Sequence, residues 1–329
     1  MDYVIIVAGM SRRAAINSGL SLVGVALLVW QVQDAGGFAA VRRGLASVGV
    51  GFGAILVLSF LRFLMRAIAW RALLGEPAPV SAALAATISG DALGNITPFG
   101  LAASEPAKAF YIGRHLDTQH AFAALAAENF FYSVSVAVYV IAGVVAMLAA
   151  FDELPIELRQ GGMAALVLMA VILAAAGWIA WRRPAMASGV LRRLPLRQVG
   201  ALADRMHDLE KLTYGSAAHE GARLGQMALA ETTFHVLSLA ESWLVLYLIT
   251  GGQSLPIVLI GALILDSVSR VINVAFKMVP MRLGVDEISS EMVGVAIGLA
   301  SGTGLVVALV RKIRMLVWAA VGLVLWTRK

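Results

Sequence analysis

Two stretches of the sequence place a proline, a leucine and a glutamate at the same spacing. They are Pro98–Glu105 and Pro280–Glu287. In each stretch, glycine and proline disfavour a continuing helix, and a carboxylate follows where the next helix would begin. The helix dipole stabilises a carboxylate in the first turn of a helix. The pattern therefore predicts two helix breaks, each followed by a helix with an acidic group near its start.

Further residues of the two stretches match in position. Ser104 and Asp286 directly precede the glutamates, and both residue types are favoured as helix N-caps. Asp91 and Asn273 each lie seven residues before the proline of their stretch. Paired interrupted helices are typical of transporter folds that arose by duplication, so the sequence predicts an internal repeat.

Ionisable and polar residues within the apolar runs are the candidates for a site, since burying a charge in a membrane is costly. Arg62 and Arg66 are four residues apart and share a helix face. Two interpretations stay open for them, namely snorkelling to the membrane interface and contact with an anion or headgroup. The residues expected to bind a lipid or other substrate are Arg62, Arg66, Asp91, Asn95, Pro98, Glu105, Lys108, Asp266, Arg270, Asn273, Pro280, Arg282, Asp286 and Glu287.

The signatures of catalysis are missing from the sequence. It has no cysteine, no nucleotide-binding loop, no serine-nucleophile motif and no zinc signature. Glu231 and His235 lie one helical turn apart, and a His–Glu pair or a proton relay is favoured there over a metal site. We therefore expect no catalytic residue, no metal and no cofactor, and a protein that is not an enzyme.

The composition indicates a membrane protein. Of 329 residues, 60% are hydrophobic and 14% charged, and the mean hydropathy is +0.84. A soluble domain carries about a quarter charged residues. Apolar runs of membrane-spanning length recur, so the sequence predicts an all-α polytopic integral membrane protein with about 7–8 transmembrane helices plus interrupted or re-entrant helices.

The distribution of charge suggests the organisation of the chain. We expect one membrane domain, 1–329, with repeat halves at about 48–150 and 224–327 joined by a basic cytoplasmic loop at about 182–223. A first span, 14–32, would remain as a signal anchor, and 33–47 would be a connector. The net charge of +6 is then explained by loops that face anionic lipid, and no nucleic-acid partner is expected.

The same charge count predicts the path of the chain through the membrane. The acidic loop 151–160 is expected outside and the basic loop 182–223 inside. Residues 80–118 must then start and end inside, which a re-entrant pair satisfies. The count also places the second motif toward the inside. It leaves open whether 288–310 crosses or dips, and on which side the chain ends.

The motifs resemble those of a known family, the flippase-like membrane region of the lysylphosphatidylglycerol synthases. The resemblance implies lipid translocation or lipid-linked transport, and in some stand-alone members an association with hopanoid synthesis. The synthases also carry a soluble aminoacyl-transferase domain that has no counterpart here, so lysyl transfer is not expected. Lys108 stands where the family has a basic residue, whereas the second copy has Ser290, which leaves a symmetric basic pair open. The residues that carry the resemblance are Asn95-Ile96-Thr97-Pro98, Ser104-Glu105-Pro106-Ala107-Lys108, Val279-Pro280, Gly284-Val285-Asp286-Glu287, Arg311-Lys312-Ile313-Arg314 and Gly322-Leu323.

We therefore expect a flippase-like or translocase-like protein of the bacterial inner membrane for a phospholipid, a lipid-linked compound or a hopanoid-type lipid. Two alternatives stay open. One is a secondary transporter of a small polar solute, coupled to protons through Asp91, Glu105 or Glu287. The other is a non-transporting subunit of a lipid-modifying or glycosyltransferase system. The expected partners are membrane lipid, a lipid-synthesis enzyme and further copies of the chain.

Overall fold

The described part of the chain is all helical. A computed structural model describes residues 37–74, 78–97, 100–113, 118–182, 221–252, 255–276 and 282–328, with the single positions 29, 33 and 208. No strand occurs among these residues, which confirms the predicted fold class. The helices are α2 (Gly37–Val48), α3 (Gly51–Leu74), α4 (Val80–Ile96), α5 (Leu101–Ile112), α6 (Thr118–Ala150), α7 (Ile156–Arg182), α10 (Gly221–Ile249), α11 (Leu255–Ala275), α12 (Val285–Ala296) and α13 (Thr303–Thr327).

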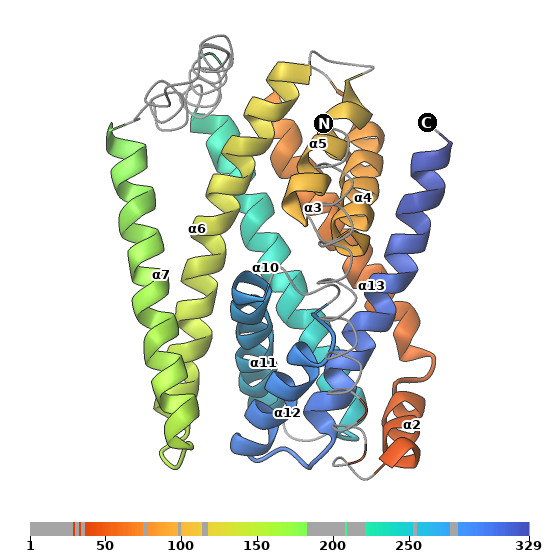
Figure 1. Cartoon of the computed structure of the whole chain (residues 1–329), viewed down its shortest axis with the longest axis vertical. Helices are drawn as coiled ribbons and strands as arrows, with labels where there is room; N and C mark the ends of the chain where they lie inside the picture. Colours follow the sequence, from red (N-terminus) through yellow and green to blue (C-terminus); the bar gives the residue numbers. More distant parts are fainter. Residues whose placement is uncertain are drawn as a thin grey trace, which may run out of the picture.

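Five of the described helices are long and apolar enough to cross a membrane, namely α3, α6, α7, α10 and α11. Helix α13 has 25 residues and also runs along the height of the bundle, but Arg311, Lys312 and Arg314 lower its apolar character (Figure 1). A polytopic membrane protein is therefore confirmed. The expected first span, 14–32, and most of the expected loop 182–223 lie outside the described residues.

One predicted boundary differs from the structure, and the path of one segment that the sequence left open is defined. Residues 33–47 are not a plain connector, because α2 occupies most of them and buries Val41 and Val48, two turns apart on one face. Residues 288–310 do not form one segment, because α12 ends at Ala296 and α13 begins only at Thr303. Twelve residues of α12 extend about 18 Å, too short to cross a bilayer core of about 30 Å.

Helices α4 and α5 form a first hairpin in the upper half of Figure 1. Helix α4 descends from the upper end, and α5 returns to that end, where α6 begins and α7 finishes. The chain reverses at Thr97–Gly100, and Gly100 takes a φ of 48°, which glycine adopts at little cost. The helix–turn–helix arrangement that a re-entrant pair over residues 80–118 requires is thus present in α4 and α5. Pro98 lies outside the described residues.

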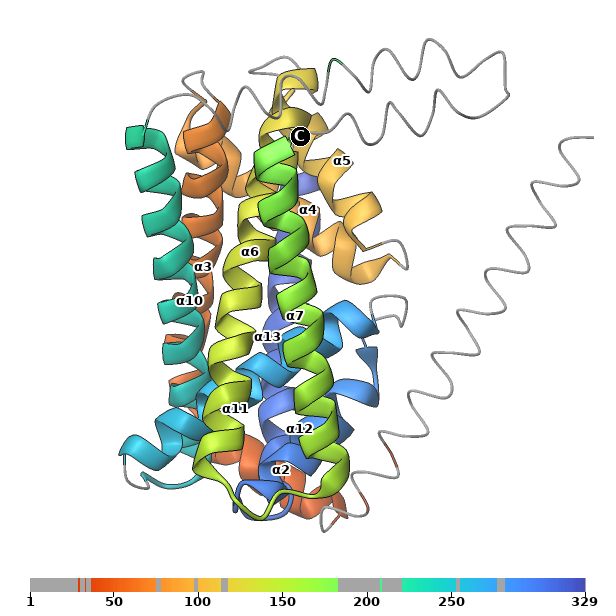
Figure 2. The same ribbon diagram turned by 90° about the vertical axis from the view of Figure 1, so that its left-hand side faces the viewer.

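Helices α11 and α12 form a second hairpin, which enters from the opposite end. Helix α10 descends the full height, α11 starts at the lower end and runs obliquely to about mid-height, and α12 returns (Figure 2). The expectation that both motifs lie toward the inside is therefore wrong. Helix α11 is long enough to cross, but its tilt and the reversal after Ala275 stop it midway. Pro280 lies outside the described residues.

The two hairpins make the internal repeat an inverted one. The series α3, α4, α5, α6 runs through the bundle in the opposite sense to the series α10, α11, α12, α13 (Figures 1 and 2). Helix α3 packs along α10, and each hairpin packs against the last helix of the other half, α4 on α13 and α11 on α6. Each half therefore depends on the other to hold its hairpin.

A glycine lies at each of these cross-half contacts. A methyl group built on Gly322 of α13 would lie 2.6 Å from the carbonyl oxygen of Ile88 in α4. One built on Gly143 of α6 would lie 2.5 Å from the Cβ of Ser267 in α11. Close backbone approach through small residues is the usual way that membrane helices pack. The hairpins are therefore held by tight helix–helix contacts.

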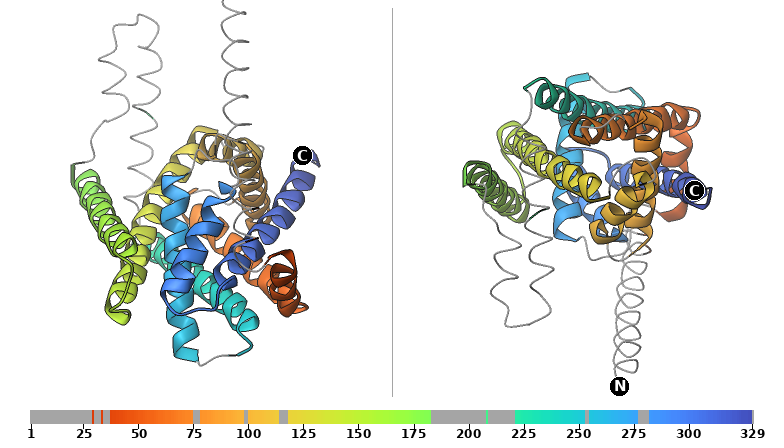
Figure 3. Two further views of the ribbon diagram at one scale, coloured as in Figure 1. Left: turned by 60° about the horizontal axis from the view of Figure 1, so that its bottom comes forward. Right: turned by 90° about the horizontal axis from the view of Figure 1, so that it is seen from above.

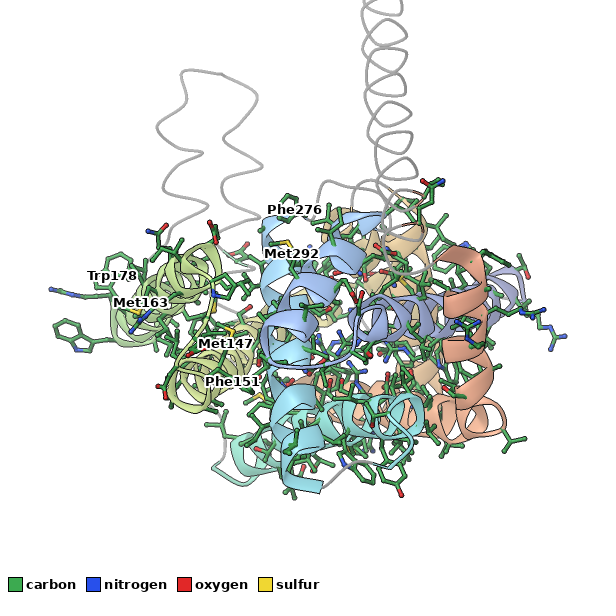
Figure 4. All side chains as sticks on the ribbon, turned by 90° about the horizontal axis from the view of Figure 1, so that it is seen from below. Met147, Phe151, Met163, Trp178, Phe276 and Met292 are labelled. Carbon is green, nitrogen blue, oxygen red and sulfur yellow. The ribbon has the colours of Figure 1, made fainter. Side chains whose placement is uncertain are left out.

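Helix α7 lies at the edge of the bundle. Seen from above, it packs mainly on α6 (Figure 3, right). Figure 4 shows Trp178 on its outer side, and this side chain is 49% exposed. Phe276 and Met292, on the outer side of the second hairpin, are also exposed. These apolar surfaces indicate which faces of the bundle contact the bilayer.

Candidate functional site

A cavity of about 720 Å³ lies where the two hairpins approach each other. Thr97 and Gly100 line it from the first hairpin, and Asn273 and Arg282 from the second. Met169 and Ile172 of the peripheral helix α7 also line it. The cavity thus combines polar residues of both hairpins with an apolar side formed by a lipid-facing helix. An amphiphilic molecule likewise has a polar part and an apolar part.

Basic side chains dominate the ionisable lining of this cavity. Only Asp91 and Glu105 supply carboxylates among the described lining residues. Four of the acids that pair with the basic groups (Glu128, Glu241, Asp266 and Asp286) do not line it. The cations therefore face the cavity, and most of their counter-charges lie behind them. The basic lining residues are Arg62, Arg66, Lys108, Arg270, Arg282 and Arg314.

Two arginines of α3 reach the cavity from one helix face, as their spacing predicts. Arg66 pairs with the buried Glu128 of α6, with 2.6 Å between Nε and Oε1. Arg62 donates to Glu241 of α10 at 2.8 Å, and Arg314 of α13 pairs with the same carboxylate. Because Glu241 is shared, loss of one of these two arginines would leave it with a partner.

Arg270 is fixed by a network on α10 and α11. Its Nη2 donates to Asp266 at 3.1 Å and to the hydroxyl of Ser238 at 2.9 Å, and Ser238 in turn donates to Asp266. Arg311 lies 3.8 Å from the other oxygen of Asp266. Asp266 therefore positions cations rather than lining the main cavity itself.

The first hairpin directs its acidic groups to the cavity. Glu105 accepts from Lys108 of the same helix at 2.8 Å and from Asn129 of α6 at 2.9 Å. Asp91 accepts from Asn95 at 2.8 Å and forms no ion pair with a described residue. All five residues line the cavity. This hairpin therefore offers both a cation and hydrogen-bond acceptors to a bound molecule.

The second hairpin uses its motif glutamate differently. Glu287 is fully buried and pairs with Lys312 of α13. Its other oxygen accepts from the backbone N–H of Gly284 at 2.9 Å, which caps α12. Arg282 donates to Asp286 at 3.3 Å and takes a positive φ of 51°. Glu287 therefore anchors the helix start and does not reach the cavity.

The predicted N-caps are wrong in both copies. Gly100 and Gly284, with φ of 48° and 81°, precede the first residues of α5 and α12. Ser104 is consequently inside α5, and Asp286 is the second residue of α12. A glycine with positive φ sets each helix start earlier than the polar residue would. Of the glutamates, only Glu287 lies in a first turn.

The cavity gathers most of the residues expected at a binding site. Asp266, Asp286 and Glu287 lie apart from its lining, although Asp286 lines a small neighbouring cavity of about 70 Å³. Pro98 and Pro280 lie outside the described residues. Those that line the cavity are Arg62, Arg66, Asp91, Asn95, Glu105, Lys108, Arg270, Asn273 and Arg282.

Sequence reasoning missed several lining residues. Arg314 was detectable, because it is a charge inside the apolar run of the last helix. Asn129, Thr87 and Tyr132 carry no comparable signal, since such residues also occur on ordinary helix faces. Within the described ranges, no three His, Asp or Glu side chains gather in a way that would hold a metal ion.

The fold and the cavity define a class of protein, namely polytopic membrane proteins built from two inverted halves with interrupted helices around a polar cavity. The family described as the lysylphosphatidylglycerol synthase TM region matches residues 18–322, so the chain belongs to that family, and the resemblance seen in its motifs is confirmed. No curated protein and no solved structure matches the chain.

Proposed function

We propose that this protein is a lipid translocase of the bacterial inner membrane and not an enzyme. In this proposal an amphiphilic lipid places its headgroup in the cavity between the hairpins, while its tail stays in the bilayer. The observation that carries the proposal is the arrangement of charge, with six basic side chains on the lining and most of their carboxylate partners behind it.

The lining selects an anionic headgroup. Guanidinium groups donate paired hydrogen bonds to phosphate oxygens, and hydrogen bonds between charged partners are about twice as strong as neutral ones. Asn95, Asn129 and Asn273 add neutral donors and acceptors suited to the hydroxyls of a glycerol or a sugar. A phosphate-containing, hydroxylated headgroup satisfies both sets of groups, whereas a purely cationic one would face six like charges against two carboxylates.

The inverted hairpins support movement of that headgroup between the two sides. The hairpins enter from opposite ends, and the inner ends of their helices lie near mid-height, as in transporters whose two repeats open alternately around one central site. The apolar side chains of α7 leave a place for the lipid tail beside the cavity. A lipid could thus be taken from one leaflet and delivered to the other without exposing its headgroup to the bilayer core.

Purified protein in liposomes tests the proposal. Fluorescent short-chain phosphatidylglycerol and phosphatidylcholine would be scored for movement between leaflets with a membrane-impermeant quencher. We expect faster movement of the anionic lipid. Arg62→Gln should slow it about tenfold or more, because it removes one charged hydrogen-bond donor, worth about 1.5–3 kcal/mol. Glu241 keeps Arg314 as a partner in this variant.

The matched control is Arg182→Gln, which removes an equal charge from the exposed end of α7. Its rate should equal that of the unmodified protein. Absence of accelerated movement with every headgroup and gradient tried would refute the proposal. Solute uptake driven by a pH gradient would instead favour the secondary transporter. Co-purification of a stoichiometric enzyme, with activity surviving Glu105→Gln, would favour the non-transporting subunit.

A further inference from the structure

A second polar cluster lies behind the aromatic wall of the cavity. The ring of His235 on α10 stacks against Tyr132 and Tyr139 of α6, with ring centroids 6.4 Å and 5.0 Å apart. The Nε2 atom of His235 lies 2.9 Å from the hydroxyl of Ser135. That hydroxyl also lies 3.4 Å from Oε2 of Glu231 and 2.9 Å from the backbone carbonyl oxygen of Tyr132, so its single proton turns from one acceptor to another when it donates to His235. Ser135 therefore connects the two titratable groups that the sequence places one turn apart.

Three polar atoms of this cluster have no hydrogen-bond partner among the described residues. They are Oε1 of Glu231, Nδ1 of His235 and the hydroxyl of Tyr139, and all three are buried. Glu231 also forms no ion pair with a described residue, unlike Glu128, Glu241 and Glu287. A buried polar group without a partner is costly, and such groups in native structures usually have a role that explains them.

The cluster is in contact with the cavity through its aromatic side chains. Tyr132 and Phe234 line the cavity and also contact the His235 ring. The guanidinium of Arg66 lies 3.8 Å from the centroid of Tyr132, and that of Arg270 lies 4.4 Å from the centroid of Tyr139. Each of the two tyrosines that stack on His235 is thus also in a cation–π contact with an arginine that lines the cavity. A change of charge on His235 or Glu231 is felt by the cations that would hold an anion.

The other charged groups facing the cluster are paired. Helix α3 contributes Arg62 and Arg66, α6 contributes Glu128, and α11 contributes Asp266 and Arg270. Glu241, on the same helix as the cluster, is held by Arg62 and Arg314 of α13. Glu231 and His235 are therefore the groups here whose proton can be gained or lost without breaking an ion pair.

We propose that Glu231, Ser135 and His235 form a proton-binding site whose occupancy is linked to anion binding in the cavity. A proton moves between the ends of the site when Glu231 gives its proton to the Ser135 oxygen and Ser135 gives its own to Nε2 of His235. This leaves a carboxylate and an imidazolium, and no group is oxidised or reduced. Uptake of a proton by the site adds a positive charge. This charge is repelled by the cations around an empty cavity, and the repulsion is compensated when the cavity binds an anion.

The linkage rests on the proposed function, and it is reciprocal. An anion that favours proton uptake is itself bound more tightly when the proton is present. Binding of the lipid headgroup should therefore take up a proton, and release of the headgroup should return it. Through this site a proton gradient would bias the direction of lipid movement.

The first test needs no lipid. Infrared difference spectra of the purified full chain would follow the carbonyl band of a protonated carboxyl group. The spectra would be recorded between about pH 5 and 9, because this pH range covers the titration of histidine and of a buried carboxyl group. We expect a band that titrates and is lost in Glu231→Gln but kept in Glu157→Gln, which changes an exposed acid of α7. Identical spectra for all three proteins would overturn the proposal.

The second test measures the linkage. Calorimetric binding of short-chain phosphatidylglycerol in buffers of different ionisation enthalpy gives the protons taken up per lipid. We expect net uptake that falls at least twofold in Glu231→Gln and in His235→Gln, and not in Glu157→Gln. Lipid binding without any proton uptake would overturn the linkage. A titrating Glu231 band with no lipid binding would support the proton site and count against the proposed function.

Discussion

The hairpins α4–α5 and α11–α12 carry the same proline-to-glutamate spacing, yet their glutamates have different surroundings. Glu105 pairs with a lysine of its own helix and lines the cavity. Glu287 is fully buried and pairs with Lys312 of α13. One carboxylate is available to a bound molecule, and the other attaches its hairpin to the rest of the bundle. The two copies of the motif have thus separated a binding role from an anchoring role.

The difference extends to how firmly each hairpin is held. In the second hairpin, Lys312 also donates to the carbonyl oxygen of Arg282 at 3.2 Å, so one side chain of α13 holds residues on both sides of the start of α12. In the first hairpin, Glu105 accepts hydrogen bonds from Lys108 of its own helix and Asn129 of α6, both in the same half, among the residues that the structure describes. The first hairpin therefore has fewer charged ties to the other half, and it is the one we expect to move when the cavity opens.

The largest expected effect is a difference in how much each of the two glutamates stabilises the folded protein. Glu287→Gln leaves Lys312 as an unpaired buried charge and should lower the free energy of unfolding by about 3–5 kcal/mol. Glu105→Gln should cost less, about 1 kcal/mol, because Lys108, although itself buried, lines the cavity, where water can solvate its charge. Equilibrium unfolding in mixed detergent micelles measures both. Equal losses would contradict the assigned roles, and the double variant Glu287→Gln/Lys312→Met should recover part of the larger loss.

An intermediate effect is expected at the glycines that hold the hairpins. Gly322→Ala and Gly143→Ala force apart helices that are in close contact and should each cost about 1–3 kcal/mol by the same measurement. Gly177→Ala in α7 is the control, because a methyl group there meets nothing within 4 Å. It should be neutral or stabilising, since alanine favours a helix over glycine by about 0.5–1 kcal/mol. A loss of stability in Gly177→Ala as large as that in Gly322→Ala would contradict the inference that close helix contacts at Gly322 and Gly143 hold the hairpins.

The smallest expected effect concerns the matched positions Asp91 and Asn273, which both line the cavity. Asp91→Asn removes a negative charge and should tighten binding of short-chain phosphatidylglycerol about two- to fivefold, while Asn273→Asp should weaken it by a similar factor. Such factors correspond to about 1 kcal/mol, the interaction of two unit charges 4 Å apart in water. Calorimetry measures both affinities. Changes of the same sign would show that the cavity does not select its ligand by charge.

Much of this arrangement could be predicted from the sequence, because charges inside apolar runs and a repeated motif are local signals. They are sufficient to predict a common polar cavity for residues such as Arg62 and Asn273, which do line one. The partner of Glu287 could not be predicted, since Lys312 lies 25 residues away on another helix. The helix starts were misplaced because the glycines at 100 and 284 adopt positive φ, and the sense of the second hairpin was misplaced because α11 is tilted.

The backbone conformation of Arg282 indicates what this residue contributes to the second hairpin. Its φ of 51° is a conformation that glycine adopts freely and that costs another residue about 1–2 kcal/mol. A glycine at this turn would therefore make the hairpin easier to form. The chain instead keeps an arginine that lines the cavity and whose guanidinium pairs with Asp286. Strain retained at such a position is typical of residues kept for their side chains, and here it indicates that the cation matters more than the ease of the turn.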